Sequence, residues 1–86
     1  MADYAIVFAR TARKELEALP AAIVQRMIPK IAGLAHNPRL RGSKKIQGER
    51  DLWRIRHADY RVIYRILDRQ KIIDIISIRH RRDAYK

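Results

Sequence analysis

Residues 52 to 67 constrain the fold most, because apolar or aromatic residues alternate with arginines on both sides of Ala58-Asp59. Successive side chains of a β-strand point to opposite faces, so alternation at period two is typical of strands. We predict two antiparallel strands joined by a tight turn at Ala58-Asp59. The register then pairs His57 with Tyr60, Arg56 with Arg61, Ile55 with Val62, and Arg54 with Ile63.

This register divides the hairpin into a basic face and an apolar face. Cross-strand partners share a face of the sheet, so Arg54, Arg56 and Arg61 converge on one side. The opposite side carries Trp53, Ile55, Val62 and Tyr64. We expect the apolar side to belong to the hydrophobic core and the basic side to bind anions. A register shifted by one residue would exchange the two faces.

The chain is strongly basic and contains no cysteine. Its 86 residues correspond to a single domain over residues 1–86. There are 20 Lys and Arg against 9 Asp and Glu, a formal net charge of +11, which favours a polyanionic partner and nucleic acid above all. The absence of cysteine fits a reducing compartment. With no signal peptide or membrane span in the pattern, we expect a cytoplasmic protein.

Helices are expected between a first strand and the hairpin. Residues 4–8 form a short apolar run that predicts a strand. Thr11 is the candidate N-cap of a helix over residues 12–19. A second helix is expected over residues 21–35, with a kink or a break at Pro29 because proline removes a backbone hydrogen bond.

Two further strands complete the predicted fold. Residues 44–47 can form a short edge strand protected by lysine, and residues 71–79 form the most apolar strand. Asp74 should lie near the end of that strand or beside an arginine. The order predicts an α+β fold, in which an N-terminal strand and a helical hairpin accompany a small, mostly antiparallel four-stranded sheet, with the helices on one face.

No sequence motif indicates a cofactor or a metal site. There is no glycine-rich phosphate loop, no histidine pair at metal spacing and no credible pair of carboxylates for two-metal catalysis. Arginine, lysine, histidine and tyrosine can still cleave RNA without metal, through its own 2′-hydroxyl. That reaction needs a base, cations for the pentavalent phosphorane and an acid for the leaving 5′-oxygen.

The C-terminal segment supplies candidates for proton transfer. Residues 79–81 (Arg-His-Arg) end the last predicted strand, beside the hairpin if that strand pairs with residues 60–67. A histidine changes its charge close to neutral pH, so His80 can act as acid or base. Tyr85 can stack on a base or share the proton transfer. The candidate RNA contacts are Lys44, Lys45, Arg65 and Arg79.

Residue types and spacing also fit readings without catalysis. An arginine-rich sheet face commonly binds phosphate without catalysis or is simply solvated. A lone histidine commonly makes structural hydrogen bonds. A tyrosine near the C-terminus can pack the tail down. Lys44 and Lys45 fit a solvated edge as well as they fit phosphate contacts.

Several short segments together resemble a known family. They are residues 40–42 (Leu-Arg-Gly), 52–56 (Leu-Trp-Arg-Ile-Arg), 59–64 (Asp-Tyr-Arg-Val-Ile-Tyr) and 78–81 (Ile-Arg-His-Arg), with Tyr85 following. The pattern is similar to the RelE branch of the RelE/ParE toxin superfamily, over residues 4 to 85. His80-Arg81 with a downstream tyrosine resembles the mRNA-cleaving members more than the gyrase-poisoning ones.

The resemblance implies a toxin of a prokaryotic type II toxin–antitoxin pair, which enters the ribosomal A site, cleaves mRNA there and so inhibits translation. It implies an acidic antitoxin, the ribosome and mRNA as partners. The positions that match the family's functional residues are Arg54, Arg56, Arg61, Arg81 and Tyr85.

One departure from the family's pattern bears on the chemistry. Founding members carry lysine where this chain has Arg54 and Arg56. Because arginine hardly releases its proton, this favours His80 or Tyr85 for proton transfer. The alternatives are a gyrase inhibitor like the ParE branch, without nuclease activity, and an RNA-binding module without catalysis.

Overall fold

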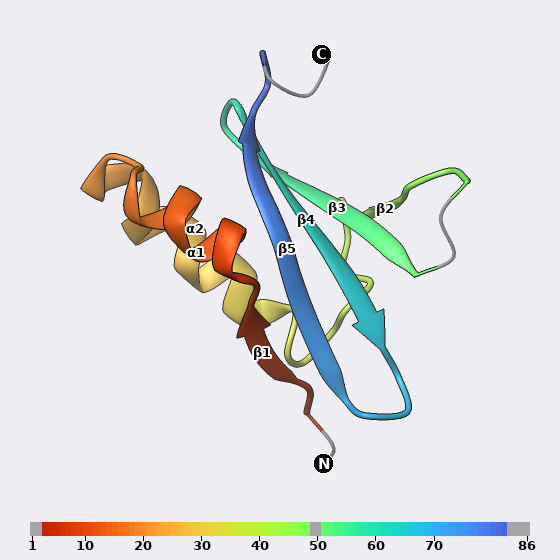
Figure 1. The fold of residues 1–86 in the computed structure, drawn as a ribbon. Helices are drawn as coiled ribbons and strands as arrows, with labels where there is room; N and C mark the ends of the chain where they lie inside the picture. Colours follow the sequence, from red (N-terminus) through yellow and green to blue (C-terminus); the bar gives the residue numbers. More distant parts are fainter. Residues whose placement is uncertain (1–2, 49–50, 83–86) are drawn as a thin grey trace.

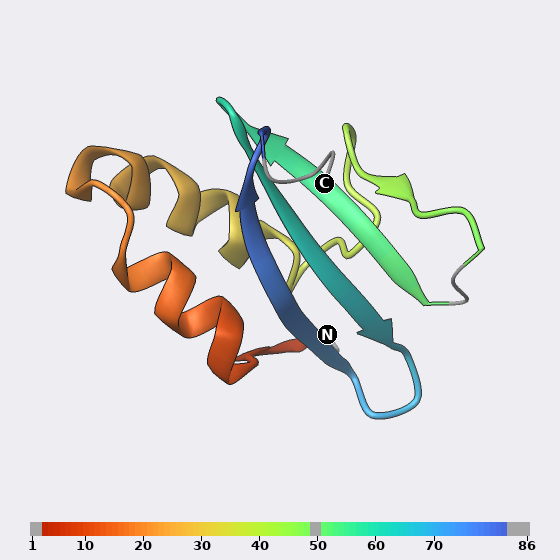
Figure 2. The ribbon, with the colours of Figure 1, turned by 45° about the horizontal axis from the view of Figure 1, so that its top comes forward.

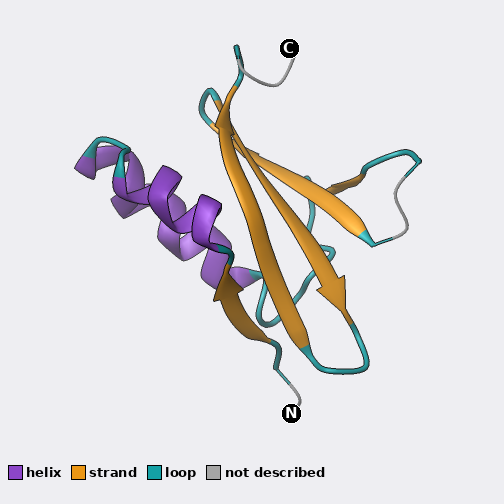
Figure 3. Cartoon of the chain, in the orientation of Figure 1, coloured by secondary structure: helices purple, strands orange, loops and turns teal. Residues whose placement is uncertain are grey.

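The computed structural model describes residues 3–48 and 51–82 and shows two helices beside one twisted sheet (Figure 1). The elements are β1 (Ala5–Phe8), α1 (Arg10–Glu17), α2 (Ala21–Gly33), β2 (Lys44–Lys45), β3 (Leu52–His57), β4 (Tyr60–Leu67) and β5 (Ile72–His80) (Figure 3). The predicted order of one strand, two helices and a run of strands is confirmed, and with it the α+β class. No helix in the described ranges is long and apolar enough to cross a membrane.

The sheet is mixed and has the strand order β1-β5-β4-β3-β2. β1 runs parallel to β5, whereas the other three neighbouring pairs are antiparallel. The prediction of four strands is wrong by one. Lys44 and Lys45 pair with Arg54 and Trp53, so the expected edge segment is a fifth strand of the sheet, although it is short.

The β3–β4 hairpin has the predicted register, from His57 opposite Tyr60 to Arg54 opposite Ile63. Both helices cover the face that carries its apolar side chains (Figure 2). The Tyr64 hydroxyl donates a hydrogen bond to the Pro38 carbonyl at 2.7 Å, and burial raises the pKa of this phenol. The core contains Ala12, Met27, Ile31, Leu34, Ile55, Val62, Tyr64, Ile66, Ile73, Ile75 and Ile78.

The first helix begins earlier than predicted, and Thr11 is not its cap. The N-cap is Ala9, whose side chain cannot cap, and Thr11 lies inside α1. The Ala9 N–H donates to the Ile75 carbonyl at 2.9 Å, while the Ala9 carbonyl accepts from Arg13 N–H at 2.9 Å. The chain therefore passes directly from the parallel strand into the helix, so strand pairing sets the helix start.

The second helix continues through Pro29 without a break. It ends at Gly33, two residues before the predicted end, where the N–H groups of Leu34, Ala35 and His36 bond three residues back instead of four. Pro29 is exposed, so its ring meets solvent on the side of α2 away from the sheet.

A bulge in β5 decides which of its side chains face the helices. Ile63 is opposite Ser77, but the next residue of β4, Tyr64, is opposite Ile75, so β5 contains one extra residue. Odd-numbered residues of β5 face the core before the bulge, and even-numbered residues face it afterwards. Arg79 therefore lies on the face opposite the helices, across from Arg61.

Charged side chains from the helices satisfy backbone groups where strand pairing stops. β1 ends opposite Ile75, and farther along β5 the Glu15 carboxylate of α1 accepts a hydrogen bond from Ile78 N–H at 2.8 Å. Toward the opposite edge of the sheet, where β3 extends beyond its pairing with β2, the Lys30 ammonium of α2 donates to the Arg56 carbonyl. Such side chains block further strand pairing at an edge.

An ion-pair cluster ties the β4–β5 turn to the rest of the domain. The Arg39 guanidinium donates to the Asp68 carboxylate at 2.9 Å and lies 5.4 Å from the Trp53 ring centroid. The Tyr4 hydroxyl donates to the same carboxylate. The hydrogen bond from Arg39, followed by that from Tyr4, lowers the pKa of Asp68.

We expect Ala58→Gly to stabilise the protein, because Ala58 has φ = +54°. A left-handed conformation costs alanine about 1–2 kcal/mol, part of which is offset by the greater freedom of glycine in the unfolded chain, so the free energy of unfolding should rise by about 0.5–1 kcal/mol. Urea unfolding measures the change. Ala22→Gly, within α2, is the matched control and should lower stability by about 0.5–1 kcal/mol. A loss of stability in Ala58→Gly would contradict the strain at this turn.

Acid is expected to remove the contribution of the Asp68 cluster. The pKa of Asp68 is lower in the folded chain than in the unfolded chain. Its ion pair therefore stabilises the fold above the ordinary carboxyl pKa, and this stabilisation is lost as the pH falls through the lowered pKa. The stability difference between the wild type and Asp68→Asn should therefore shrink as the pH falls below the ordinary carboxyl pKa of about 4 toward the lowered pKa of Asp68. Urea unfolding at several pH values tests this, with Glu17→Gln on the exposed side of α1 as control. A difference that does not vary with pH would argue against the cluster.

Candidate functional site

Three arginines from neighbouring strands form a row across the sheet face opposite the helices. Arg56 of β3 lies opposite Arg61 of β4, and Arg61 lies opposite Arg79 of β5. Cβ atoms of directly opposed residues are about 4.5–5.5 Å apart, and like charges at this spacing destabilise a sheet. Guanidinium groups match the geometry of phosphate oxygens. A bound polyanion would relieve the repulsion, so the row is suited to bind one.

The surface at the end of this row has two adjoining depressions. One, of about 330 Å³, is lined by Arg56, Ala58, Asp59, Tyr60, Arg61 and Arg81. The other, of about 590 Å³, is lined by Asp59, His80, Arg81 and Arg82. Asp59 and Arg81 border both, and Arg81 N–H donates to the Asp59 carbonyl at 2.6 Å. This hydrogen bond holds the end of β5 against the hairpin turn.

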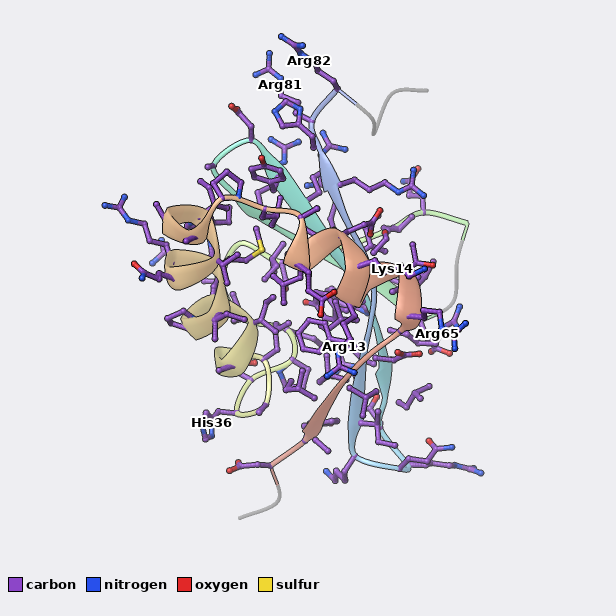
Figure 4. All side chains as sticks on the ribbon, turned by 60° about the vertical axis from the view of Figure 1, so that its left-hand side comes forward. Arg13, Lys14, His36, Arg65, Arg81 and Arg82 are labelled. Carbon is purple, nitrogen blue, oxygen red and sulfur yellow. The ribbon has the colours of Figure 1, made fainter. Side chains whose placement is uncertain are left out.

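The structure brings Arg56, Arg61 and Arg81, three of the expected basic positions, to the lining of one depression. The three residues lie far apart in the sequence and come from different strands or strand ends. Figure 4 shows Arg81 and Arg82 extending from the end of the sheet, well away from Arg65.

His80 borders the second depression from the helix-facing side of the sheet. It lies opposite Tyr60, and the two rings meet edge to face with centroids 5.2 Å apart. Its Nδ1 atom accepts a hydrogen bond from Arg82 N–H at 3.2 Å. A neutral imidazole has one N–H, so this bond places the proton on Nε2 and leaves His80 as a donor at that atom.

The remaining candidates lie at different places on the sheet. Arg54 lies on the same face two residues before Arg56 in β3. Its neighbours there are Lys44 of β2 on one side and Ile63 of β4 on the other. Arg65 is on the same side as Arg61, four residues or about 13 Å along the strand, and is opposite Asp74 as expected for that carboxylate. Lys45 is opposite Trp53 and so lies on the helix-facing side, away from the arginine row. Tyr85 lies outside the described residues.

Two charged residues in the depressions are absent from the predicted site. The sequence places Asp59 in the hairpin turn and in the family pattern without a role in the site, and it assigns no role to Arg82. The hairpin register contained a signal for Asp59, because a turn next to the Arg56–Arg61 pair must adjoin those arginines. Arg82 carried no such signal.

The chemistry available here is that of cations, one imidazole, one phenol and one carboxylate. Across residues 3–48 and 51–82, no group of three or more His, Cys, Asp or Glu side chains is arranged to hold a metal ion. The depressions are open to solvent and basic, and they can bind phosphate groups and move protons between bound groups.

Comparisons with known proteins agree with this arrangement. Residues 6–85 match the model of the ParE toxin of the type II toxin–antitoxin system parDE. Toxin RelG of Mycobacterium tuberculosis is 31% identical over 84 residues, which cover 96% of this chain and 97% of that protein.

Solved structures show the same fold. The toxin–antitoxin complex RelBE2 of Mycobacterium tuberculosis has a TM-score of 0.80 at 31% identity, covering 92% of this chain and 99% of that one. The archaeal RelE–RelB complex of Pyrococcus horikoshii has a TM-score of 0.81 at 31% identity, covering 94% and 97%. The chain therefore belongs to the RelE/ParE superfamily of toxins from type II toxin–antitoxin systems.

Proposed function

We propose that this toxin is a ribosome-dependent endoribonuclease, which cleaves mRNA in the ribosomal A site and so inhibits translation. The observation that carries the proposal is the depression lined by Arg56, Arg61 and Arg81. Cleavage by a 2′-hydroxyl builds extra negative charge on the phosphate in the transition state, and preorganised cations stabilise that charge. The similarity to RelG and to the RelE structures favours the RelE branch.

Each residue of the site has a place in this reaction. Arg61 and Arg81 bind the scissile phosphate, and Arg56 and Arg79 bind phosphates on either side of it, because they continue the same row. In its imidazolium form, His80 gives a proton to the leaving 5′-oxygen as general acid. No metal takes part. Tyr85 remains a candidate to stack on a base of the mRNA.

The partner that restrains the toxin is an acidic antitoxin. The similar chains from Mycobacterium tuberculosis and Pyrococcus horikoshii were solved as toxin–antitoxin and RelE–RelB complexes. A net charge of +11 attracts an acidic segment over a distance of about one Debye length and accelerates its binding. An antitoxin that covers the arginine row would also exclude RNA from it.

Replacement of Arg61 or Arg81 by alanine should abolish cleavage while the fold is kept. Removal of one cation that stabilises the transition state costs about 100- to 1,000-fold in rate. Primer extension on an mRNA in a translating extract measures the cuts, and circular dichroism checks the fold. Arg69→Ala removes the same charge in the turn between β4 and β5 and should cut like the wild type.

Three outcomes of this experiment have distinct meanings. Absence of new cuts with folded wild-type protein would rule out the nuclease. Near-normal cutting by Arg61→Ala and Arg81→Ala would show that the site lies elsewhere. Loss of cutting in Arg69→Ala to the same extent would indicate a general effect of charge.

Inhibition of DNA gyrase is the second candidate function, because the matching family model is that of the ParE toxin. On this alternative, the arginine row binds an acidic protein surface or DNA, and His80 has no chemical role. A supercoiling assay with purified gyrase discriminates between the two functions. We expect no inhibition at toxin concentrations that give complete mRNA cutting, and inhibition without cutting would favour the ParE branch.

A further inference from the structure

Asp59 is the one carboxylate among the described residues that line the two depressions. Asp59 borders both depressions, the one lined by Arg56 and Arg61 and the one lined by His80. Its carbonyl accepts the hydrogen bond from Arg81 N–H, so the backbone of Asp59 is fixed relative to the end of β5. Asp59 thus differs from the other lining residues in carrying a carboxylate, and it shares with Arg81 alone among them a place in both depressions.

A carboxylate in this place weakens the binding of a polyanion. A negative charge next to a bound phosphate lowers the affinity for it. A site that only bound RNA would therefore bind it more tightly with a neutral residue in this turn. Asparagine and glycine suit tight turns as well as aspartate does. The carboxylate therefore has a use that phosphate binding alone does not explain.

The neighbouring side chains do not accept a proton in the state that the structure shows. Arginines stay protonated at neutral pH, and an ordinary phenol is a hydrogen-bond donor that also keeps its proton there. The free nitrogen of His80, Nδ1, already accepts the Arg82 N–H, and its Nε2 carries the hydrogen. Among the described lining residues, this leaves the Asp59 carboxylate as the proton acceptor.

We propose that the Asp59 carboxylate is the general base, which takes the proton from the 2′-hydroxyl of the nucleotide bound in the first depression. This assignment rests on the nuclease function proposed above. The O–H bond of the 2′-hydroxyl breaks, and its proton goes to a carboxylate oxygen of Asp59 while the 2′-oxygen bonds to phosphorus. The bond from phosphorus to the 5′-oxygen breaks, and the leaving oxygen takes a proton from the imidazolium form of His80, which becomes a neutral imidazole.

The products of this step are a 2′,3′-cyclic phosphate and a free 5′-hydroxyl. Asp59 and His80 both line the second depression, and Asp59 and Arg81 also line the first. Base and acid therefore border one surface, on which the scissile phosphate is bound. Arg81 between them binds the phosphate itself.

The test measures single-turnover cleavage of mRNA on purified ribosomes that hold a tRNA in the P site. Asp59→Asn keeps the size of the side chain and removes its basicity, so cleavage should slow by about 100-fold or more. Ribosome affinity, measured by pelleting, should stay unchanged or rise, because a negative charge is removed. Glu17→Gln on α1 loses the same charge far from the depressions and should cleave like the wild type.

Chemical rescue separates a base from a residue that only shapes the turn. Asp59→Ala opens space for a small carboxylate, and added formate should restore cleavage in proportion to its concentration, whereas chloride at equal ionic strength should not. Circular dichroism confirms that the variants fold.

The outcomes distinguish this assignment from the function on which it rests. If the wild type does not cleave, the nuclease function and the base assignment both fail. If the wild type cleaves and Asp59→Asn retains its rate within about threefold, where a lost general base costs at least about 100-fold, only the assignment of Asp59 fails. Slow cleavage by Asp59→Ala that formate does not restore overturns the assignment as well.

Discussion

Burial of one face of the β3–β4 hairpin is the constraint on which the other features depend. Ile55, Val62 and Tyr64 are enclosed between the sheet and the helices. Burial of such side chains stabilises the fold by about 1.5–3 kcal/mol each. A register slip would expose them and bury arginines, at a cost of several kcal/mol for each unpaired charge. The register is therefore tightly specified, and the arginines are held together on the solvent side although they repel one another.

The bulge in β5 extends this arrangement to the third strand. If this same sequence formed a regular strand without the bulge, strict alternation from Ile73 would direct Arg79 and Arg81 toward the helices. With it, both ends of β5 direct isoleucines into the core, and the arginines join the basic face. Bulges commonly re-aim side chains next to functional sites. Because of this one extra residue, β5 contributes isoleucines to the core on both sides of the bulge and Arg79 to the basic face.

The two ends of the sheet differ in chemistry. At one end, Tyr4, Arg39 and Asp68 form a charge-balanced cluster that joins the N-terminal segment, the loop after α2 and the β4–β5 turn. At the other, cations predominate, and Asp59 and Arg81 are joined through the backbone. Balanced charge suits a structural anchor, whereas excess positive charge suits a surface that receives an anionic partner.

Local pattern in the sequence determined much of this protein. Period-two alternation specified the hairpin, its register and its two faces, because burial of one face admits one alignment. The spacing of apolar residues indicated the helices. Sequence did not reveal that Thr11 lies inside α1, because pairing between Ala9 and Ile75 sets that boundary. Nor did it show the bulge or the place of Asp59 between two depressions, which depend on contacts between residues distant in the chain. Only the tertiary structure decided which arginines meet and which carboxylate-bearing residue borders the same depressions.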